Sequence, residues 1–145
     1  MDATPIVLER LLNAPVATVW KAITDKDEMK QWYFNLPEFK AEVGFEFEMT
    51  GGKTPEKQYL HHCMVTEVIV NKKISYTWRF VGYEGNSLVT FELAEEGNQT
   101  RLTLTHSGIE TFSANEEDFA IGEFEIGWAY LLDNSLKPYL EKTIK

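Results

Sequence analysis

The sequence predicts one α+β domain, in which an antiparallel sheet carries a long C-terminal helix on one face. Three observations support this: apolar residues at alternate positions through the middle of the chain, short turns between these segments, and helical apolar spacing near the end. The 145 residues suit one domain of ordinary size, with enough chain to build a core. Residues 1–145 are therefore expected to fold as a single unit.

The first part of the chain predicts one strand and two short helices. Residues 5–12 form a short apolar segment, and Pro15 suits the first position of a helix because its missing N–H costs nothing there. Apolar residues at helical spacing continue to Thr24. Asp25 can cap the second short helix, which carries Met29 and Trp32.

The middle of the chain predicts the sheet. Strands are expected where apolar and polar residues alternate, at residues 45–49, 58–70, 74–80, 89–93 and 102–106. Tight turns join consecutive segments, which favours an antiparallel meander. Each strand has one apolar and one polar face, so the sheet is expected to be covered on one side only.

The last 31 residues, 115–145, predict one long helix that covers the sheet. Apolar residues recur there at three- and four-residue steps, after acidic residues and before lysines, as the helix dipole favours. Gly122 and Gly127 each weaken a helix by roughly 1 kcal/mol. Close packing against the sheet, or room for a ligand beside Trp128, would explain them. Pro138 is expected to disturb the last turns.

The composition disfavours several classes of function. A net charge of −9 argues against binding to nucleic acid or anionic lipid, because both need a basic surface. The single cysteine, Cys63, allows no internal disulfide and no all-cysteine zinc site. No segment approaches the roughly 18 apolar residues of a membrane span, and no secretion signal is evident. We therefore expect no membrane insertion and a cytoplasmic location.

Several segments of the chain resemble a known family. They are residues 10–15 (RLLNAP), 19–25 (VWKAITD), 31–32 (QW), 76–78 (YTW), 100–108 (TRLTLTHSG) and 127–132 (GWAYLL). The first three resemble the opening of the SRPBCC superfamily of START-like and birch-pollen-allergen-like proteins. The others are similar to its branch related to the C-terminal domain of the heat-shock-protein-90 ATPase activator.

The resemblance implies a helix-grip fold, in which a curved antiparallel sheet of about seven strands wraps around the C-terminal helix and encloses an apolar cavity. It implies non-enzymatic binding of a small hydrophobic or aromatic ligand, such as a lipid, with no cofactor. Two alternatives stay open. One is a protein-interaction module that binds a chaperone, with a role in the stress response. The other is an enzyme of the polyketide cyclase or hydrolase type.

Strand alternation and helical spacing predict which side chains face the interior, where they either line a cavity or fill the core. The candidates are Phe45, Phe47, Tyr76, Trp78, Phe91, Leu104, His106, Phe124, Trp128 and Leu132, with Tyr130 as a further aromatic and Arg10 as a further polar group. An apolar pocket with a few polar groups suits a small hydrophobic ligand. His106 is interpreted in three ways: a buried, hydrogen-bonded histidine, a polar handle for the ligand, or a general base.

Other reactive side chains predict no metal or catalytic site. His61 and His62 are adjacent on one strand, so they point to opposite faces and cannot bind one ion together. Cys63 is expected to be a small buried residue. Glu46 and Glu48 share a face that is expected to be solvated, and spacing alone does not make them an acid–base pair. The sequence has no phosphate-binding loop, serine-nucleophile motif or dinucleotide motif.

Overall fold

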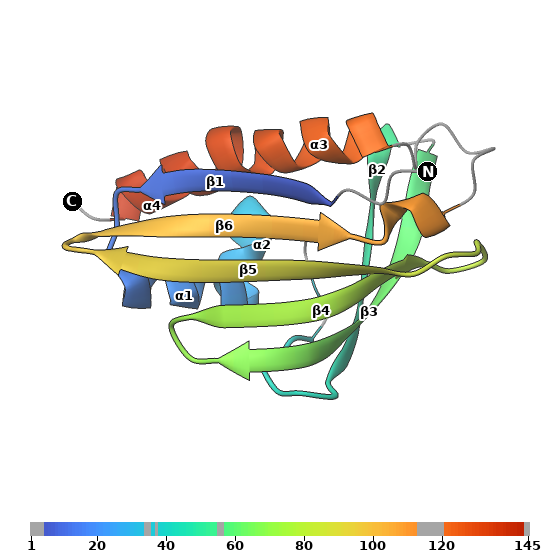
Figure 1. The fold of residues 1–145 in the computed structure, drawn as a ribbon, viewed down its shortest axis with the longest axis horizontal. Coiled ribbons are helices and arrows are strands. Elements are labelled where there is room, and N and C mark those ends of the chain that lie inside the picture. Colours follow the sequence, from blue (N-terminus) through green and yellow to red (C-terminus); the bar gives the residue numbers. More distant parts are fainter. Residues whose placement is uncertain (1–4, 34–35, 37, 55–56, 113–120, 144–145) are drawn as a thin grey trace.

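The computed structural model describes residues 5–33, 36, 38–54, 57–112 and 121–143. Its elements are β1 (Ile6–Leu12), α1 (Val16–Thr24), α2 (Lys26–Trp32), β2 (Glu46–Thr54), β3 (Lys57–Ile69), β4 (Lys73–Phe80), β5 (Ser87–Glu96), β6 (Gln99–Ser107), the 3-10 turn η1 (Ile109–Thr111), α3 (Ile121–Tyr130), the π-helix η3 (Leu131–Leu136) and α4 (Lys137–Thr143). This order confirms the predicted α+β class (Figure 1).

The strands form one antiparallel sheet in the order β1-β6-β5-β4-β3-β2. β1 pairs with the last strand, from Ile6 opposite His106 to Leu12 opposite Thr100. The other neighbours in the sheet are also neighbours in the chain, as the tight turns predict. Among the described residues the sheet has six strands, close to the approximate seven that the family resemblance implies.

The sheet is strongly curved. In Figure 1, β2 and β3 turn steeply away from the direction of β5 and β6. The register between β3 and β4 shifts between Val65 and Glu67, and such a bulge increases the local twist. β5 and β6 are joined by a two-residue loop, in which Gly97 has a φ of +65° that glycine adopts without steric cost.

α1 and α2 pack together beside the sheet. Asp25 follows α1 and caps α2, because its side chain accepts a hydrogen bond from the backbone N–H of Glu28 at 3.2 Å. α2 buries Met29 and Trp32. The indole N–H of Trp32 donates to the carbonyl of Ala22 at 2.8 Å, which ties α2 to α1. Both predicted short helices and the cap are therefore confirmed.

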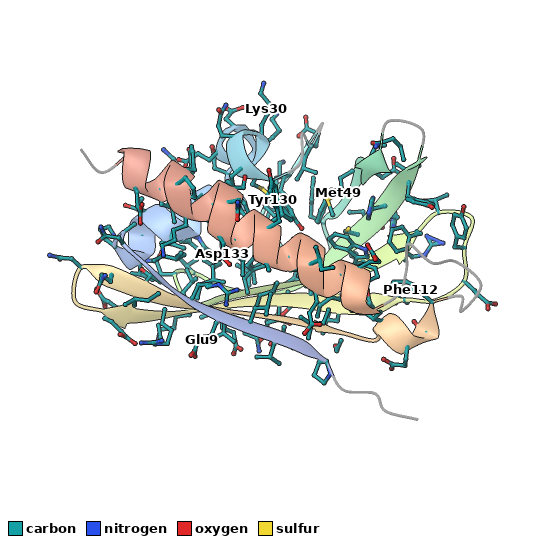
Figure 2. All side chains as sticks on the ribbon, turned by 90° about the horizontal axis from the view of Figure 1, so that it is seen from above. Glu9, Lys30, Met49, Phe112, Tyr130 and Asp133 are labelled. Carbon is teal, nitrogen blue, oxygen red and sulfur yellow. The ribbon has the colours of Figure 1, made fainter. Side chains whose placement is uncertain are left out.

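The C-terminal helix lies across the sheet (Figure 2). It consists of the three consecutive elements α3, η3 and α4. α3 continues into the π-helix η3, which gives way to α4 directly before Pro138. Proline has no N–H, so regular helical bonding is interrupted near this position, as the sequence predicts. The buried Leu132, Leu136 and Leu140 keep the predicted apolar face. The start that the sequence predicts for this helix, residues 115–120, lies outside the described residues.

Candidate functional site

The strand register gathers polar and aromatic candidates on the inner face of the sheet. His106 on β6 lies opposite Val89 on β5, which lies opposite Tyr76 on β4. In the next row, Leu104 lies opposite Phe91. All five side chains are buried, with 2% or less of their surface exposed. Alternation along each strand therefore predicts correctly that they share the covered face.

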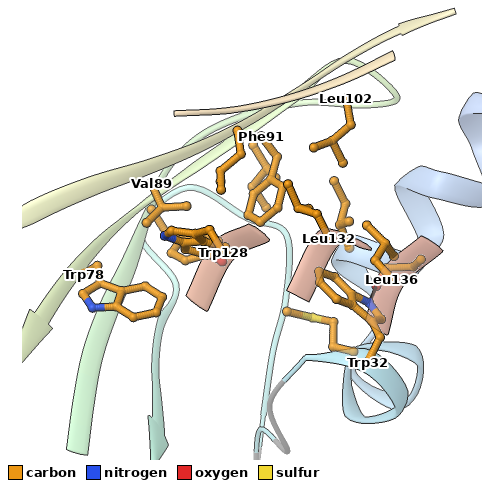
Figure 3. Packing of buried hydrophobic residues seen from close by; sticks show 14 of the residues in the cluster. Trp32, Trp78, Val89, Phe91, Leu102, Trp128, Leu132 and Leu136 are labelled. Atoms are coloured by element: carbon orange, nitrogen blue, oxygen red, sulfur yellow. Dashed lines mark hydrogen bonds between the residues drawn. The ribbon is translucent and has the colours of Figure 1, made fainter. Parts of the chain in front are cut away.

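The C-terminal helix places three more candidates against this face. Phe124, Trp128 and Leu132 are 9%, 2% and 0% exposed. The ring of Trp128 lies 5.5 Å from that of Trp78 and 5.9 Å from that of Phe91, between centroids, and Figure 3 shows how closely these side chains pack. Trp128 therefore packs directly on rings of β4 and β5, in the region where the family resemblance implies a cavity.

His106 is the polar centre of this interior, and both of its ring nitrogens are hydrogen-bonded. The indole N–H of Trp128 donates to Nδ1 at 2.9 Å, so Nδ1 carries no proton. Nε2 therefore carries the ring proton and donates to Oγ of Ser87 at 2.8 Å, and Ser87 donates to the carbonyl of Trp78 at 2.7 Å. Burial lowers the pKa of His106 to about 3, so the ring is neutral at pH 7.

A pair of tyrosine hydroxyls forms a second polar group in the interior. The hydroxyls of Tyr33, directly after α2, and Tyr76, on β4, lie 2.7 Å apart. Burial raises the pKa of both hydroxyls and that of the nearby Cys63 thiol, so all three groups stay protonated and uncharged. Tyr33 also stacks on Trp128, with ring centroids 6.0 Å apart.

His61 is a second buried imidazole, which the sequence did not single out as a site residue. Its Nδ1 donates to the carbonyl of Met49 at 3.0 Å, and its ring lies 4.9 Å from that of Trp78. Burial lowers the pKa of His61 to about 4. The available signal was strand alternation, since His61 and His62 do face opposite sides as predicted. His61 lies on the covered face.

Some aromatic residues of the interior come from segments without regular alternation. Phe39 and Phe112 are buried and lie outside the strands and α-helices. Phe112 stacks on Phe124 at 5.8 Å, and Phe39 contacts the ring of Phe47 edge-on at 5.0 Å. Phe45 is only half-buried, with its ring 6.3 Å from that of Phe39. Periodicity gives no signal for residues in loops, so the sequence missed Phe39 and Phe112.

Three expectations about which residues belong to the interior are wrong. Gly122 and Gly127 are exposed, and a Cβ on either would lie in open space, so they neither pack against the sheet nor make room inside it. Tyr130 is 61% exposed and lies outside the interior (Figure 2). Arg10 is not an interior group either, because it forms an ion pair with Asp133 at the edge of the sheet, with an Nε–Oδ1 distance of 2.7 Å.

The acidic pair on β2 faces solvent, as the sequence predicts. Glu46 and Glu48 are exposed and, with His62, line an open hollow of about 360 Å³. Nε2 of His62 donates to Oε1 of Glu46 at 2.9 Å. Within the described part of the chain, no three His, Cys, Asp or Glu side chains gather in a way that would hold a metal ion. No described helix combines the length and apolar character needed to cross a membrane.

Solved structures of similar fold match nearly the whole chain. Protein MLL2253 from Mesorhizobium loti is 27% identical, with a TM-score of 0.81, over 98% of this chain and 100% of that chain. CalU16 from Micromonospora echinospora is 24% identical, with a TM-score of 0.74, over 94% and 75% of the two chains. DynU16, a protein in the dynemicin biosynthetic locus, is 20% identical, with a TM-score of 0.70, over 93% and 49%. The last two likenesses show the fold alone.

A family model extends this similarity to the sequence. The model for Activator of Hsp90 ATPase homolog 1-like proteins matches residues 13–141. No curated protein matches the chain. The matched segment includes α1, α2, the strands β2 to β6 and almost all of the described C-terminal helix. The chain therefore belongs to the family of Activator of Hsp90 ATPase homolog 1-like proteins, in the SRPBCC superfamily of helix-grip folds.

Proposed function

We propose that this protein binds one small, uncharged hydrophobic or aromatic molecule between its C-terminal helix and its sheet, without changing it chemically. The proposal rests on the chemical character of the buried side chains. Among the described residues, the buried set contains many aromatic rings and two neutral histidines, but no Asp, Glu, Lys or Arg. A charged ligand would lose its hydration there without gaining an ionic partner, whereas a neutral ring system would gain apolar and aromatic contacts.

Removal of apolar surface from water would supply the affinity. At roughly 25 cal/mol per Å², a ligand that buries about 300 Å² gains on the order of 7 kcal/mol before the costs of association. A hydrogen bond to the hydroxyl of Tyr76, which can both donate and accept, would then fix its orientation. Because Trp128 and its neighbours pack closely in this structure, binding requires some of these side chains to move apart.

The hydrogen bonds of His106 favour binding over catalysis. A general base needs a free lone pair directed at the proton that it removes. The lone pair of Nδ1 already accepts the indole N–H of Trp128, and Nε2 carries a proton that it donates to Ser87. Burial also keeps the pKa of this ring at about 3, so it is a weak base in this arrangement.

The comparisons support a ligand-binding role in general terms. DynU16, which has the same fold, belongs to a biosynthetic locus, a setting in which small molecules are made. We propose a cytoplasmic location for the present protein. Its single cysteine, Cys63, is a buried free thiol, which is typical of proteins in reducing compartments.

Two fluorescent probes of similar size test the proposal. N-phenyl-1-naphthylamine is uncharged, and 8-anilino-1-naphthalenesulfonate carries a negative charge. We expect the uncharged probe to bind one per chain, at least ten-fold more tightly than the sulfonate, because no Lys or Arg is buried among the residues that the structure describes. In ¹⁵N–¹H spectra the indole signals of Trp78 and Trp128 should shift, while that of Trp20 on α1 should not. Equal binding of both probes, or unchanged Trp78 and Trp128 signals, would contradict the proposal.

One observation favours a second candidate function, a protein-interaction module that binds a chaperone in a stress response. Ile126 and Tyr130 lie one turn apart on the outer side of α3, and they are 68% and 61% exposed. Large apolar side chains that are grouped on a surface often mark a contact with another protein. The family description names an Hsp90 ATPase activator, which makes Hsp90 the partner to test.

Calorimetry with Hsp90 from the same host tests this second candidate. We expect the double substitution Ile126→Ala and Tyr130→Ala to weaken binding at least ten-fold. Val70→Ala, which removes a side chain that is 67% exposed at the turn after β3, should leave it unchanged. Failure of the unsubstituted protein to bind Hsp90 would count against a chaperone partner.

A further inference from the structure

α3 contains two glycines that no packing contact explains. Within the described part of the chain, no atom other than those of the adjacent residues and the helix's own backbone lies within 4 Å of a Cβ built on Gly122 or Gly127. Neither glycine has a positive φ, so alanine fits both positions without strain. Each glycine nevertheless lowers the local helix–coil equilibrium about five-fold relative to alanine. The helicity of α3 is therefore weakened at two points, with no gain in packing in the observed state.

The segment that follows α3 is held in place from two sides. Asp133 of η3 accepts two hydrogen bonds from Arg10 of β1, at 2.7 and 3.1 Å. Ser135 of η3 donates to the carbonyl of Trp32, the last residue of α2, at 2.6 Å. The leucine side chains of η3 and α4 that point inward are 0–1% exposed. η3 is therefore fixed both to the edge of the sheet and to the second helix.

α3 itself rests on the interior through two aromatic side chains. Phe124 packs against several aromatic rings. The distances between ring centroids are 5.8 Å to Phe112 and 5.1 Å to His106. Trp128 packs on Trp78 and donates its indole N–H to His106. Separation of α3 from the sheet would uncover these rings and the hydrogen-bonded histidine. The same rings line the interior in which the ligand is proposed to bind.

We propose that α3 is a hinged cover of the interior. In this proposal Ile121–Tyr130 unwinds at its glycines and leaves the sheet, while η3 and α4 remain in place as the fixed side of the hinge. The opening exposes the interior between Phe124, Trp128 and the sheet. That this opening admits a ligand rests on the function proposed above, whereas the opening itself is a property of the protein alone.

Native-state hydrogen exchange, measured by mass spectrometry without any ligand, tests the hinge. In the unsubstituted protein we expect amides of α3 to exchange at least ten-fold faster than those of η3, after correction for intrinsic rates. In the double variant Gly122→Ala and Gly127→Ala, exchange in α3 should slow by about 25-fold, the product of two five-fold effects, while exchange in η3 should change little.

Glu125→Ala provides the matched control. Glu125 is an exposed residue of the same helix, and glutamate and alanine are both good helix formers, so exchange in α3 should stay within about two-fold. Equal exchange of α3 and η3 in the unsubstituted protein, or unchanged exchange in the double glycine variant, would overturn the hinge. Binding of N-phenyl-1-naphthylamine is measured separately, so failure of the hinge and failure of the proposed function give different results.

Discussion

Because two histidines are buried in the neutral form, we expect the protein to lose stability in weak acid. Burial holds the pKa of His106 at about 3 and that of His61 at about 4, against about 6.5 in an unfolded chain. Below pH 6.5 the unfolded chain therefore binds protons that the folded protein does not bind. Stability is fully present above pH 6.5 and declines as the pH falls, towards 4 for His61 and towards 3 for His106. At pH 5 we expect a loss of about 2 kcal/mol per histidine.

Urea unfolding at pH 7.5, 6 and 5 measures this loss. His62 is the control, because it lies on the outer face with its ring bonded to Glu46. We expect His62→Gln to leave the decline between pH 7.5 and 5 nearly unchanged. A free energy of unfolding that stays constant over this range would show that the interior imidazoles are not held neutral by burial.

Substitution of Ser87 tests the chain of hydrogen bonds that sets the tautomer of His106. Its hydroxyl accepts from Nε2 of His106 and donates to the carbonyl of Trp78, and the residue is 4% exposed. Ser87→Ala leaves a buried donor and a buried acceptor without this partner, so we expect a loss of about 1–3 kcal/mol of unfolding free energy. Ser107→Ala, at a half-buried serine of the neighbouring strand, should cost less than about 0.5 kcal/mol. Equal effects in chemical denaturation would argue against the hydrogen-bond chain.

In the C-terminal helix, we expect the burial of apolar side chains to contribute more to the free energy of unfolding than ion pairing does. Leu132 of η3 is fully buried, so Leu132→Ala should lower the free energy of unfolding by about 2–5 kcal/mol. The preceding leucine, Leu131, is half-buried, and its replacement by alanine should cost clearly less. Asp133→Asn removes the charge of a partly exposed ion pair with Arg10 and should cost less than about 1 kcal/mol. Comparable losses for Leu131→Ala and Leu132→Ala in urea unfolding would place the helix in a different register.

For single helices and strands, the sequence predicts those features that local sequence patterns, such as the spacing of apolar residues, can encode. Alternation predicts the strands and their covered faces, and the Asp25 cap marks the junction of the two short helices. The π-helix before Pro138 was not predicted as such, because a proline shows that bonding is interrupted but not how the neighbouring turns rearrange. The glycines lie away from the face that Phe124, Trp128 and Leu132 share, so helical spacing could have placed them on the exposed side of α3.

At the scale of the whole molecule, the sequence predicts the fold better than the site. The family motifs and the order of elements lead to the helix-grip arrangement, and parity places His106 and Tyr76 on one face. Whether rings from different elements meet or leave a void depends on three-dimensional packing, to which loop residues such as Phe39 and Phe112 contribute. The neutral state of the interior also emerges only when the fold brings its polar groups together.

The most direct test of ligand binding is native mass spectrometry of the protein purified from its own host. We expect a non-covalent complex whose additional mass, of a few hundred daltons, disappears under denaturing conditions. The released molecule should be uncharged and rich in apolar or aromatic groups, because the described part of the chain buries no charged side chain. A released ligand that carries a carboxylate or phosphate would contradict the proposed function. So would a protein that carries no ligand and also fails to bind N-phenyl-1-naphthylamine.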